Sequence, residues 1–196
     1  MACRIPDLTA DHESSKQSAQ ASSPPMPARI ELRDYDPVWP RLYAREAARI
    51  RSVLGERVVR LEHAGSTSVP GLAAKPVIDI VLEVPDASEE AAYLPAMQAA
   101  GYGLRLREPD WFQHRLLKGP DTDINLHVFS AHCPETDRML LFRDWLRGNA
   151  GDRELYVRTK RELAVRPWTS VQQYADAKTA VIGAILARAQ GTDAPS

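Results

Sequence analysis

The chain contains 196 residues, 44% of them hydrophobic, which is enough to bury one core and a small helical extension. Its 25 basic and 26 acidic side chains give a net charge of −1, so there is no electrostatic basis for binding nucleic acid irrespective of sequence. Cys3 and Cys133 are too few for a disulfide framework, and no apolar stretch is long enough to span a bilayer. Residues 1–7 lack the apolar centre of a signal peptide. We therefore expect a cytoplasmic protein with neither a membrane nor nucleic acid as a partner.

The ends of the chain differ in composition from the rest. Residues 1–28 are rich in Ser, Gln, Ala and Pro and show no apolar periodicity, which predicts a disordered tail. A second, short disordered tail is predicted at residues 191–196. Between them, residues 29–190 are expected to form a single domain.

The first two-thirds of that domain alternate between helical and strand patterns. Asp36 is predicted to cap a first helix that Gly55 ends, and Ser88 to begin a second helix that Gly101 stops. Runs of apolar residues that alternate with polar ones predict five strands, over residues 57–63, 76–84, 103–107, 112–118 and 123–129. The turn-forming residues 119–121 should join the last two strands as a hairpin.

From Cys133 onward the periodicity is helical. Three helices are predicted, over residues 135–147, 153–165 and 171–189, with Ser170 as the cap of the last one. Strands followed by a run of helices indicate an α+β fold. We expect a mixed β-sheet with helices packed on one side and a C-terminal helical layer.

The loop between the first two strands carries the strongest functional signal. It contains Gly65 and three hydroxyl residues, 66–68, and the next strand carries one isolated acid, Asp79, thirteen residues after Ser66. Free backbone N–H groups in such a turn can hold phosphate, and an acid on the next strand can hold a phosphate-bound cation. The turn alone could be only a turn, and Asp79 could be an ordinary cap or ion-pair partner. The two features together at this spacing favour a functional site.

This pattern resembles the signature of the nucleotidyltransferase superfamily, the fold of DNA polymerase beta. A more specific similarity is to the GrpB family, whose members carry a segment much like residues 63–80. The similarity extends over about residues 29–188 and includes 126–128, 142–147 and 174–178. The resemblance implies a nucleotidyltransferase-type sheet, a nucleoside triphosphate such as ATP as substrate, and a divalent metal.

One departure from the superfamily pattern concerns the metal. A second acid usually lies two residues beyond the first, where this chain has Val81, and Glu83 lies about 13 Å from Asp79 along the strand. A two-metal site is therefore not expected. Asp79, His63 and His127 are the candidate metal ligands and catalytic residues. A site rich in imidazole favours Zn, Mn, Fe or Ni over Mg. Alternatively, one Mg²⁺ binds with ATP at Asp79, and the two histidines donate to phosphate or move protons.

Histidine near a strand end is more often structural than a ligand, and His114 and His132 are weaker candidates. The predicted nucleotide-binding residues lie in the turn, before the second strand, and on the C-terminal helices, where an aromatic ring four residues from a cation can hold a base beside a phosphate. They are Gly65, Ser66, Thr67, Lys75, Arg143, Lys160 and Lys178. Each cation could equally be a solvated surface charge.

Three functions follow as hypotheses. The first is an enzyme that transfers a nucleotidyl group to a small-molecule acceptor, or adenylates and ligates it. The second is a nucleotide- or metabolite-binding module without turnover, related to coenzyme A metabolism, because GrpB-like domains also occur fused to dephospho-coenzyme A kinase. The third is a metal-dependent hydrolase that uses the His and Asp residues. The sequence leaves open the acceptor, the base and whether the chain forms a homo-oligomer.

Overall fold

A computed structural model describes residues 30–191. The predicted disordered tails lie outside the described residues, apart from Gly191. All five predicted strands are present: β1 (Arg60–Ala64), β2 (Ile78–Val84), β3 (Gly103–Glu108), β4 (His114–Lys118) and β5 (Ile124–Ser130). The helices are α1 (Trp39–Leu54), α2 (Leu94–Ala99), α3 (Pro134–Gly148), α4 (Ala150–Ala164), α5 (Val171–Asp176) and α6 (Thr179–Ala189). Short 3-10 turns occur at Gly55–Arg57, Ser66–Ser68 and Glu90–Ala92.

The strands form one mixed sheet in the order β1-β2-β5-β4-β3. Strands β2 and β5 pair in parallel at its centre, and the other neighbours are antiparallel. The predicted hairpin at residues 119–121 is confirmed, because β4 and β5 pair directly across it. Nearly every residue of the two central strands is buried, as expected for strands covered on both faces.

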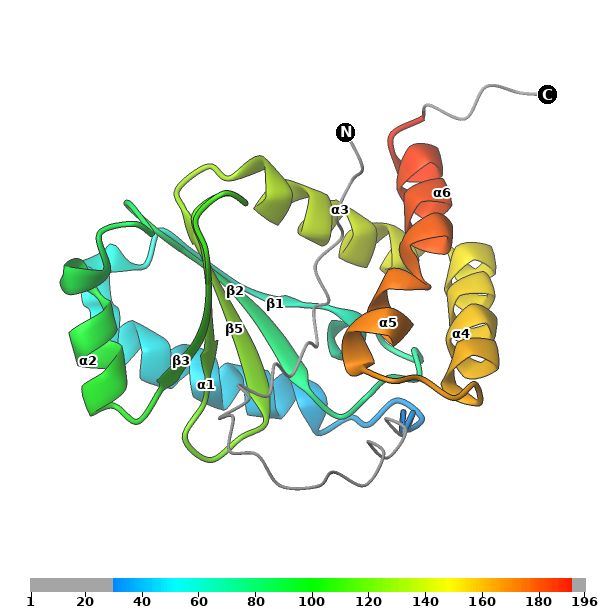
Figure 1. Ribbon diagram of the computed structural model, residues 1–196, viewed down its shortest axis with the longest axis horizontal. Coiled ribbons are helices and arrows are strands. Elements are labelled where there is room, and N and C mark those ends of the chain that lie inside the picture. Colours follow the sequence, from blue (N-terminus) through cyan, green and yellow to red (C-terminus); the bar gives the residue numbers. More distant parts are fainter. Residues whose placement is uncertain (1–29, 192–196) are drawn as a thin grey trace, which may run out of the picture.

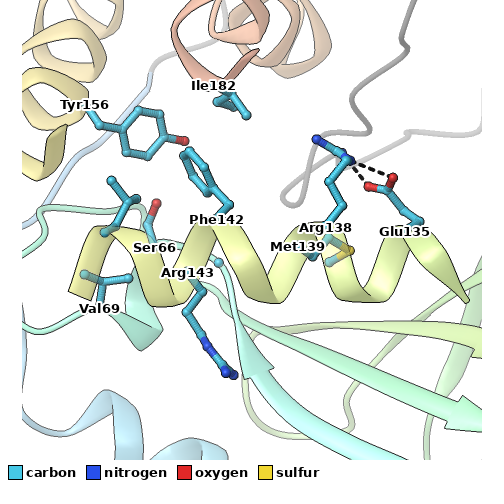
Figure 2. Close-up of a pocket in the computed structure, with 11 residues that line it drawn as sticks. Ser66, Val69, Glu135, Arg138, Met139, Phe142, Arg143, Tyr156 and Ile182 are labelled. Carbon is cyan, nitrogen blue, oxygen red and sulfur yellow. Dashed lines mark hydrogen bonds and ion pairs between the residues drawn. The ribbon is translucent and has the colours of Figure 1, made fainter. Parts of the chain in front are cut away.

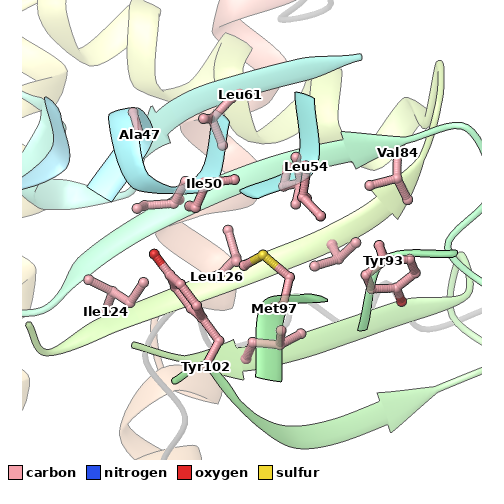
Figure 3. Close-up of a cluster of buried hydrophobic side chains, with 14 of the residues drawn as sticks. Ala47, Ile50, Leu54, Leu61, Val84, Tyr93, Met97, Tyr102, Ile124 and Leu126 are labelled. Carbon is pink, nitrogen blue, oxygen red and sulfur yellow. The ribbon is translucent and has the colours of Figure 1, made fainter. Parts of the chain in front are cut away.

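Helices α1 and α2 cover one face of the sheet (Figure 1). Ala47, Ile50 and Leu54 recur at helical spacing on α1 and pack on Leu61 of β1 and on the apolar residues of β2 and β5 (Figure 3). Met97 of α2 completes this core. The alternating apolar side chains of β2 and β5 therefore pack against α1 and α2, and the polar side chains between them lie on the opposite face of the sheet.

Two predicted helix starts were wrong. Helix α1 begins at Trp39, and Asp36 accepts a hydrogen bond from Val38 N (2.8 Å) in the turn before it. Ser88 likewise bonds Asp86 in a turn, while α2 begins only at Leu94. The reason for the second difference is Pro95, since proline is tolerated in the first turn of a helix and not in its interior.

Helix α3 covers the second face of the sheet, where Met139 and Leu140 pack on Ala64, Val81 and Phe129. Helices α4, α5 and α6 gather at one end of the molecule (Figure 1). The α+β class, the mixed sheet and the C-terminal helical layer are thereby confirmed, with helices on both faces. Within residues 30–191, no helix combines the length and apolar character needed to cross a membrane.

The last predicted helix, over residues 171–189, is broken into α5 and α6 at Ala177 and Lys178. At this break Lys178 N bonds Ala175 O, three residues back, in place of the regular helical partner. Ser170 caps α5 as predicted, because its hydroxyl accepts from Gln173 N at 3.2 Å. The break places Lys178 at the N-terminus of α6, as its N-cap residue.

Candidate functional site

The Gly-Ser turn and the isolated acid meet directly. Ala64, at the end of β1, pairs with Asp79 of β2, so the turn that follows passes next to the carboxylate. Gly65 has φ +64°, and a Cβ built on it would lie 2.2 Å from Asp79 Oδ2. Only glycine allows both this backbone conformation and this close approach. The predicted convergence of turn and acid is present in the structure.

Asp79 is buried, with only 2% of its surface exposed, and two neighbours come from β5. Asn125, its partner in the parallel register, donates from Nδ2 to Asp79 Oδ1 at 3.0 Å. His127 lies two residues further on the same face, and its Nε2 is 4.0 Å from Asp79 Oδ1. Asp123 lies outside this group, since it is exposed and its Oδ1 accepts from Lys118 Nζ.

His127 is the end of a chain of polar side chains. Its Nδ1 is 3.0 Å from His114 Nε2, and His114 Nδ1 is 2.9 Å from Glu108 Oε2. The His114 ring packs against Trp111 and Phe129, so that it is almost fully enclosed. Burial lowers the pKa of His114 to about 4, although Glu108 opposes this shift. His114 is therefore neutral near pH 7.

Two lysines from the C-terminal helices reach the same place. Lys160 donates from Nζ to Ser66 Oγ at 3.1 Å and to Ala73 O, and it lies over the Tyr156 ring. Lys178 lies over the Tyr174 ring with its Nζ 4.7 Å from the ring centroid. Burial, and then the nearby positive charge of Lys178, hold the pKa of Lys160 well below its usual value, while Asp79 opposes the shift. Lys160 thus contacts the turn, and Lys178 lies close enough to Lys160 to affect its pKa.

His63 does not belong to this group. It pairs with Ile80, whose side chain points to the α1 face, and its ring stacks on Tyr43 of α1 at 4.8 Å. Its Nε2 is hydrogen-bonded to Thr67 Oγ1 at 3.1 Å, and the predicted role of Thr67 in binding phosphate stays a prediction. Burial, followed by the charges of Arg147 and Arg143, lowers the pKa of His63 to about 3. The structure therefore brings Asp79 and His127 together and places His63 on the opposite face of the sheet.

Arg143 is engaged elsewhere. It donates to Glu62 Oε2 (2.8 Å), to His63 O and to Asp144, and its side chain extends away from Phe142 and Tyr156 (Figure 2). A role in binding phosphate would require it to leave these partners. Lys75 lies half-buried in the loop before β2, and its predicted role stays a prediction.

A small cavity lies beside the turn, between α3 and the C-terminal helices. It has a volume of about 30 Å³ and is lined by Ser66, Phe142, Tyr156 and Ile182, among others (Figure 2). Such a space holds about one water molecule. The cavity is therefore too small to hold a triphosphate. An open groove of about 610 Å³, which includes His63 and Arg147 in its lining, lies on the other side of the turn.

Asp79 and His127 would supply two ligands to one cation, which is too few to hold a metal ion without water or a bound molecule in the rest of its shell. Within residues 30–191, no three His, Cys, Asp or Glu side chains are grouped closely enough to hold a metal ion. Two donor atoms at about 2.1 Å from one ion lie between about 3 Å and 4.2 Å apart, depending on whether they are adjacent or opposite. The 4.0 Å between Asp79 Oδ1 and His127 Nε2 falls in this range. Phosphate oxygens and water would complete the shell.

Sequence reasoning missed Asn125 as a partner of Asp79, and it ranked His114 low and did not consider Glu108. Asn125 and His127 are two residues apart on one strand and therefore lie on the same face of the sheet, so the sequence already indicated that Asn125 lies near Asp79. Glu108 and His114 meet only through the register of the β3–β4 hairpin. That register includes an irregularity between Leu104 and Leu106, and no sequence period encodes it.

Comparison with known proteins places the chain in a family. The family model for the GrpB protein matches residues 29–188. The chain belongs to the GrpB family. A UPF0157 protein from Halalkalibacterium halodurans is 59% identical over 168 residues, covering 86% of each chain, and one from Streptomyces coelicolor is 48% identical over 165 residues, covering 84% of this chain and 87% of that one.

The fold is also shared with a solved structure of a GrpB-family member. The crystal structure of a conserved GrpB protein from Enterococcus faecalis superposes with a TM-score of 0.73 at 31% identity, covering 82% of this chain and 98% of that one. A protein named dephospho-CoA kinase from Mycolicibacterium paratuberculosis is 28% identical over 177 residues. In that match 77% of this chain corresponds to 44% of the kinase.

Proposed function

We propose that this GrpB-family protein binds a nucleoside triphosphate together with a divalent cation and transfers a nucleotidyl group to a small-molecule acceptor. The observation that carries this proposal is the meeting of Asp79, Ser66 and Lys160 around Gly65. A hydroxyl turn, a buried acid and buried cations are the groups that a triphosphate and its cation require. Adenylation of an acceptor carboxylate, followed by ligation, uses the same groups.

Each residue has a separate task in this scheme. Ser66 and the backbone of the turn hold the outer phosphates, and Lys160 and Lys178 neutralise the charge of the leaving pyrophosphate. Asp79, kept in place by Asn125, anchors the cation, and His127 lies beside it. When bound, the cation stabilises negative charge on the phosphates. Because the cavity beside the turn is too small for a triphosphate, the C-terminal helices would have to move apart from α3 to admit the nucleotide. Their return would then exclude water from the site.

A binding module without turnover is the second candidate. Val81 stands where the second acid of the superfamily pattern is expected, and the similarity to proteins named dephospho-CoA kinase favours an accessory role next to a coenzyme A enzyme. A hydrolase with a resident metal is less well supported, since the described part of the chain holds no three-ligand group.

Turnover of ATP tests the proposal. The protein is incubated with ATP, Mg²⁺ or Mn²⁺ and a pool of small hydroxyl, amine and carboxylate acceptors, and pyrophosphate and adducts are measured by mass spectrometry. We expect pyrophosphate only when acceptors are present, and Asp79→Asn should reduce the rate by about 100-fold or more. Asp123→Asn, which changes an exposed acid immediately before the neighbouring strand β5, is the matched control and should retain the rate. Binding of ATP without consumption would favour the module, and cleavage of phosphate esters without nucleotide would favour the hydrolase.

A further inference from the structure

One buried atom near the site has no protein partner. His127 is 1% exposed, and its Nε2 accepts and donates no hydrogen bond within residues 30–191. Buried polar atoms almost always have a partner in folded proteins, so an exception indicates a missing group. Asp79 Oδ1 lies 4.0 Å from this nitrogen, which is too far for a hydrogen bond.

The side chains behind His127 determine where its proton lies. The carboxylate of Glu108 only accepts, so His114 donates from Nδ1 to Glu108 and its Nε2 carries a lone pair. That lone pair requires a donor, which is Nδ1–H of His127. The two rings are inclined by only 20° with centroids 5.1 Å apart, the arrangement that an in-plane N–H···N bond produces. With its proton on Nδ1, the His127 ring can present a lone pair from Nε2.

Two electron-pair donors therefore face each other across 4.0 Å, the carboxylate of Asp79 and the imidazole of His127. A cation between them could be bound by both and would give His127 Nε2 a partner. On the neighbouring strand, His127 is the direct register partner of Val81, which stands where the second acid of the superfamily pattern is expected. The side chain beside the absent carboxylate thus supplies a nitrogen ligand.

We propose that Asp79 and His127 form a mixed carboxylate–imidazole cation site, and that Glu108 and His114 are positioning residues that fix His127 as the ligand. This inference rests on the proposed function and specifies the cation. Metal-bound histidines typically donate their second ring N–H to a carboxylate or a similar acceptor, and Asn125 plays the corresponding part for Asp79. An imidazole ligand favours transition ions over Mg²⁺. The site should therefore prefer Mn²⁺, Co²⁺ or Zn²⁺ to Mg²⁺.

The first test needs no ligand. Nitrogen-15 NMR of the histidine-labelled, metal-free protein at neutral pH reports which ring nitrogen of each histidine is protonated. We expect His127 to be protonated at Nδ1 alone, and Glu108→Gln and His114→Phe to remove this single preference. His132→Asn is the control, because His132 is exposed and is not part of the hydrogen-bonded series of Glu108, His114 and His127. Its backbone has φ +61°, a conformation that asparagine tolerates. A proton on Nε2 of His127 in the unmodified protein would overturn the proposal.

The second test uses Mn²⁺ alone and then Mn²⁺ with ATP, followed by electron paramagnetic resonance. We expect a nitrogen coupling from a directly bound imidazole, lost in His127→Gln and retained in His132→Asn. Glu108→Gln should weaken Mn²⁺ binding by about 10- to 100-fold. A bound Mn²⁺ without nitrogen coupling would overturn the ligand assignment. ATP turnover in the unmodified protein is measured separately, so failure of the cation site and failure of nucleotidyl transfer give different results.

Discussion

Gly65 and Gly71 lie in the same loop, and both adopt left-handed backbone conformations, with φ +64° and +77°. They differ in their surroundings. A Cβ on Gly65 would collide with Asp79, whereas a Cβ on Gly71 would meet nothing within 4 Å. The pair separates the cost of the backbone conformation from the cost of the close approach to the acid.

Alanine at each position should therefore have different effects. Gly71→Ala carries only the backbone strain and should lower the free energy of unfolding by about 1–2 kcal/mol. Gly65→Ala adds the collision and should cost about 2–4 kcal/mol, while also displacing Asp79 and weakening cation-dependent ATP binding. Chemical denaturation and calorimetric titration measure the two effects. Equal losses of stability and binding in both variants would contradict the role of Gly65 at the carboxylate.

Lys160 provides a pH test of the phosphate site. Its pKa is held well below the usual lysine value, mainly by burial, and only the protonated ammonium attracts phosphate. ATP affinity should therefore fall as pH rises through this lowered pKa. Lys160→Arg stays charged and should remove that part of the pH dependence, whereas Lys160→Met should weaken binding at every pH by about tenfold or more. Calorimetric titration from pH 6 to 9 gives the profiles, and a Lys160→Met variant that binds like the unmodified protein would exclude Lys160 from the site.

At the scale of the elements, one ion pair fastens the C-terminal layer. Arg188 of α6 donates to both carboxylate oxygens of Asp152 on α4, and Trp145 Nε1 of α3 donates to the same carboxylate. Asp152 is mostly buried, and its pKa is lowered by these bonds, Arg188 first. Three helices therefore share a single acid at this end of the molecule.

Removing the positive charge of Arg188 should destabilise the packing of α3, α4 and α6. Arg188→Gln leaves Asp152 without its charged partner and should lower the free energy of unfolding by about 1–3 kcal/mol. Hydrogen exchange should increase in α4 and α6 and remain unchanged in β2 and β5. Arg161→Gln, which breaks the exposed pair with Asp34, is the control and should change stability by less than about 1 kcal/mol. Equal effects of the two variants would show that Asp152 does not hold the helices together.

The elements differed in how well the sequence predicted them. Strands were found because apolar residues alternate on β2 and β5, and α3 was found because its apolar residues recur at helical spacing. The break between α5 and α6 was missed because Ala177 and Lys178 include no glycine or proline. Helix α4 starts three residues early because Asn149 caps it, accepting from Asp152 N.

The part of the site formed by residues close in sequence was predicted, and the part that depends on distant contacts was not. The turn and Asp79 are close in sequence, so their meeting followed from two adjacent strands. His63 was misplaced although the sequence held the signal, since Leu61 and His63 are two residues apart and share the face that packs on α1. The contacts of Lys160 with Ser66, 94 positions away, depend on how a whole helical layer docks, which no local pattern encodes.

At the scale of the whole molecule, the sheet buries ionisable groups on both of its faces. His63 lies on the α1 face and His114 on the α3 face, with pKa values lowered to about 3 and about 4. Each is neutral in the folded protein and would take up a proton in the unfolded chain below the ordinary histidine pKa of about 6.5. The unfolded state therefore binds more protons over this interval, and folding stability must fall as pH falls.

The size of this effect can be tested with one substitution. Each buried histidine should remove about 1.4 kcal/mol of unfolding free energy per pH unit, from about pH 6.5 down to its own lowered pKa. His63→Phe preserves the stacking on Tyr43 but cannot titrate, so its stability should fall less steeply between pH 6.5 and 4.5, by about 1.4 kcal/mol per unit. At pH 7.5 it should be less stable by about 1 kcal/mol, because Thr67 Oγ1 loses its partner. Denaturant unfolding at several pH values measures both quantities, with His132→Asn as the exposed control that should keep the original slope. An unchanged slope in His63→Phe would mean that His63 is accessible to protons in the folded protein, and the buried position between Tyr43 and Thr67 would then be wrong.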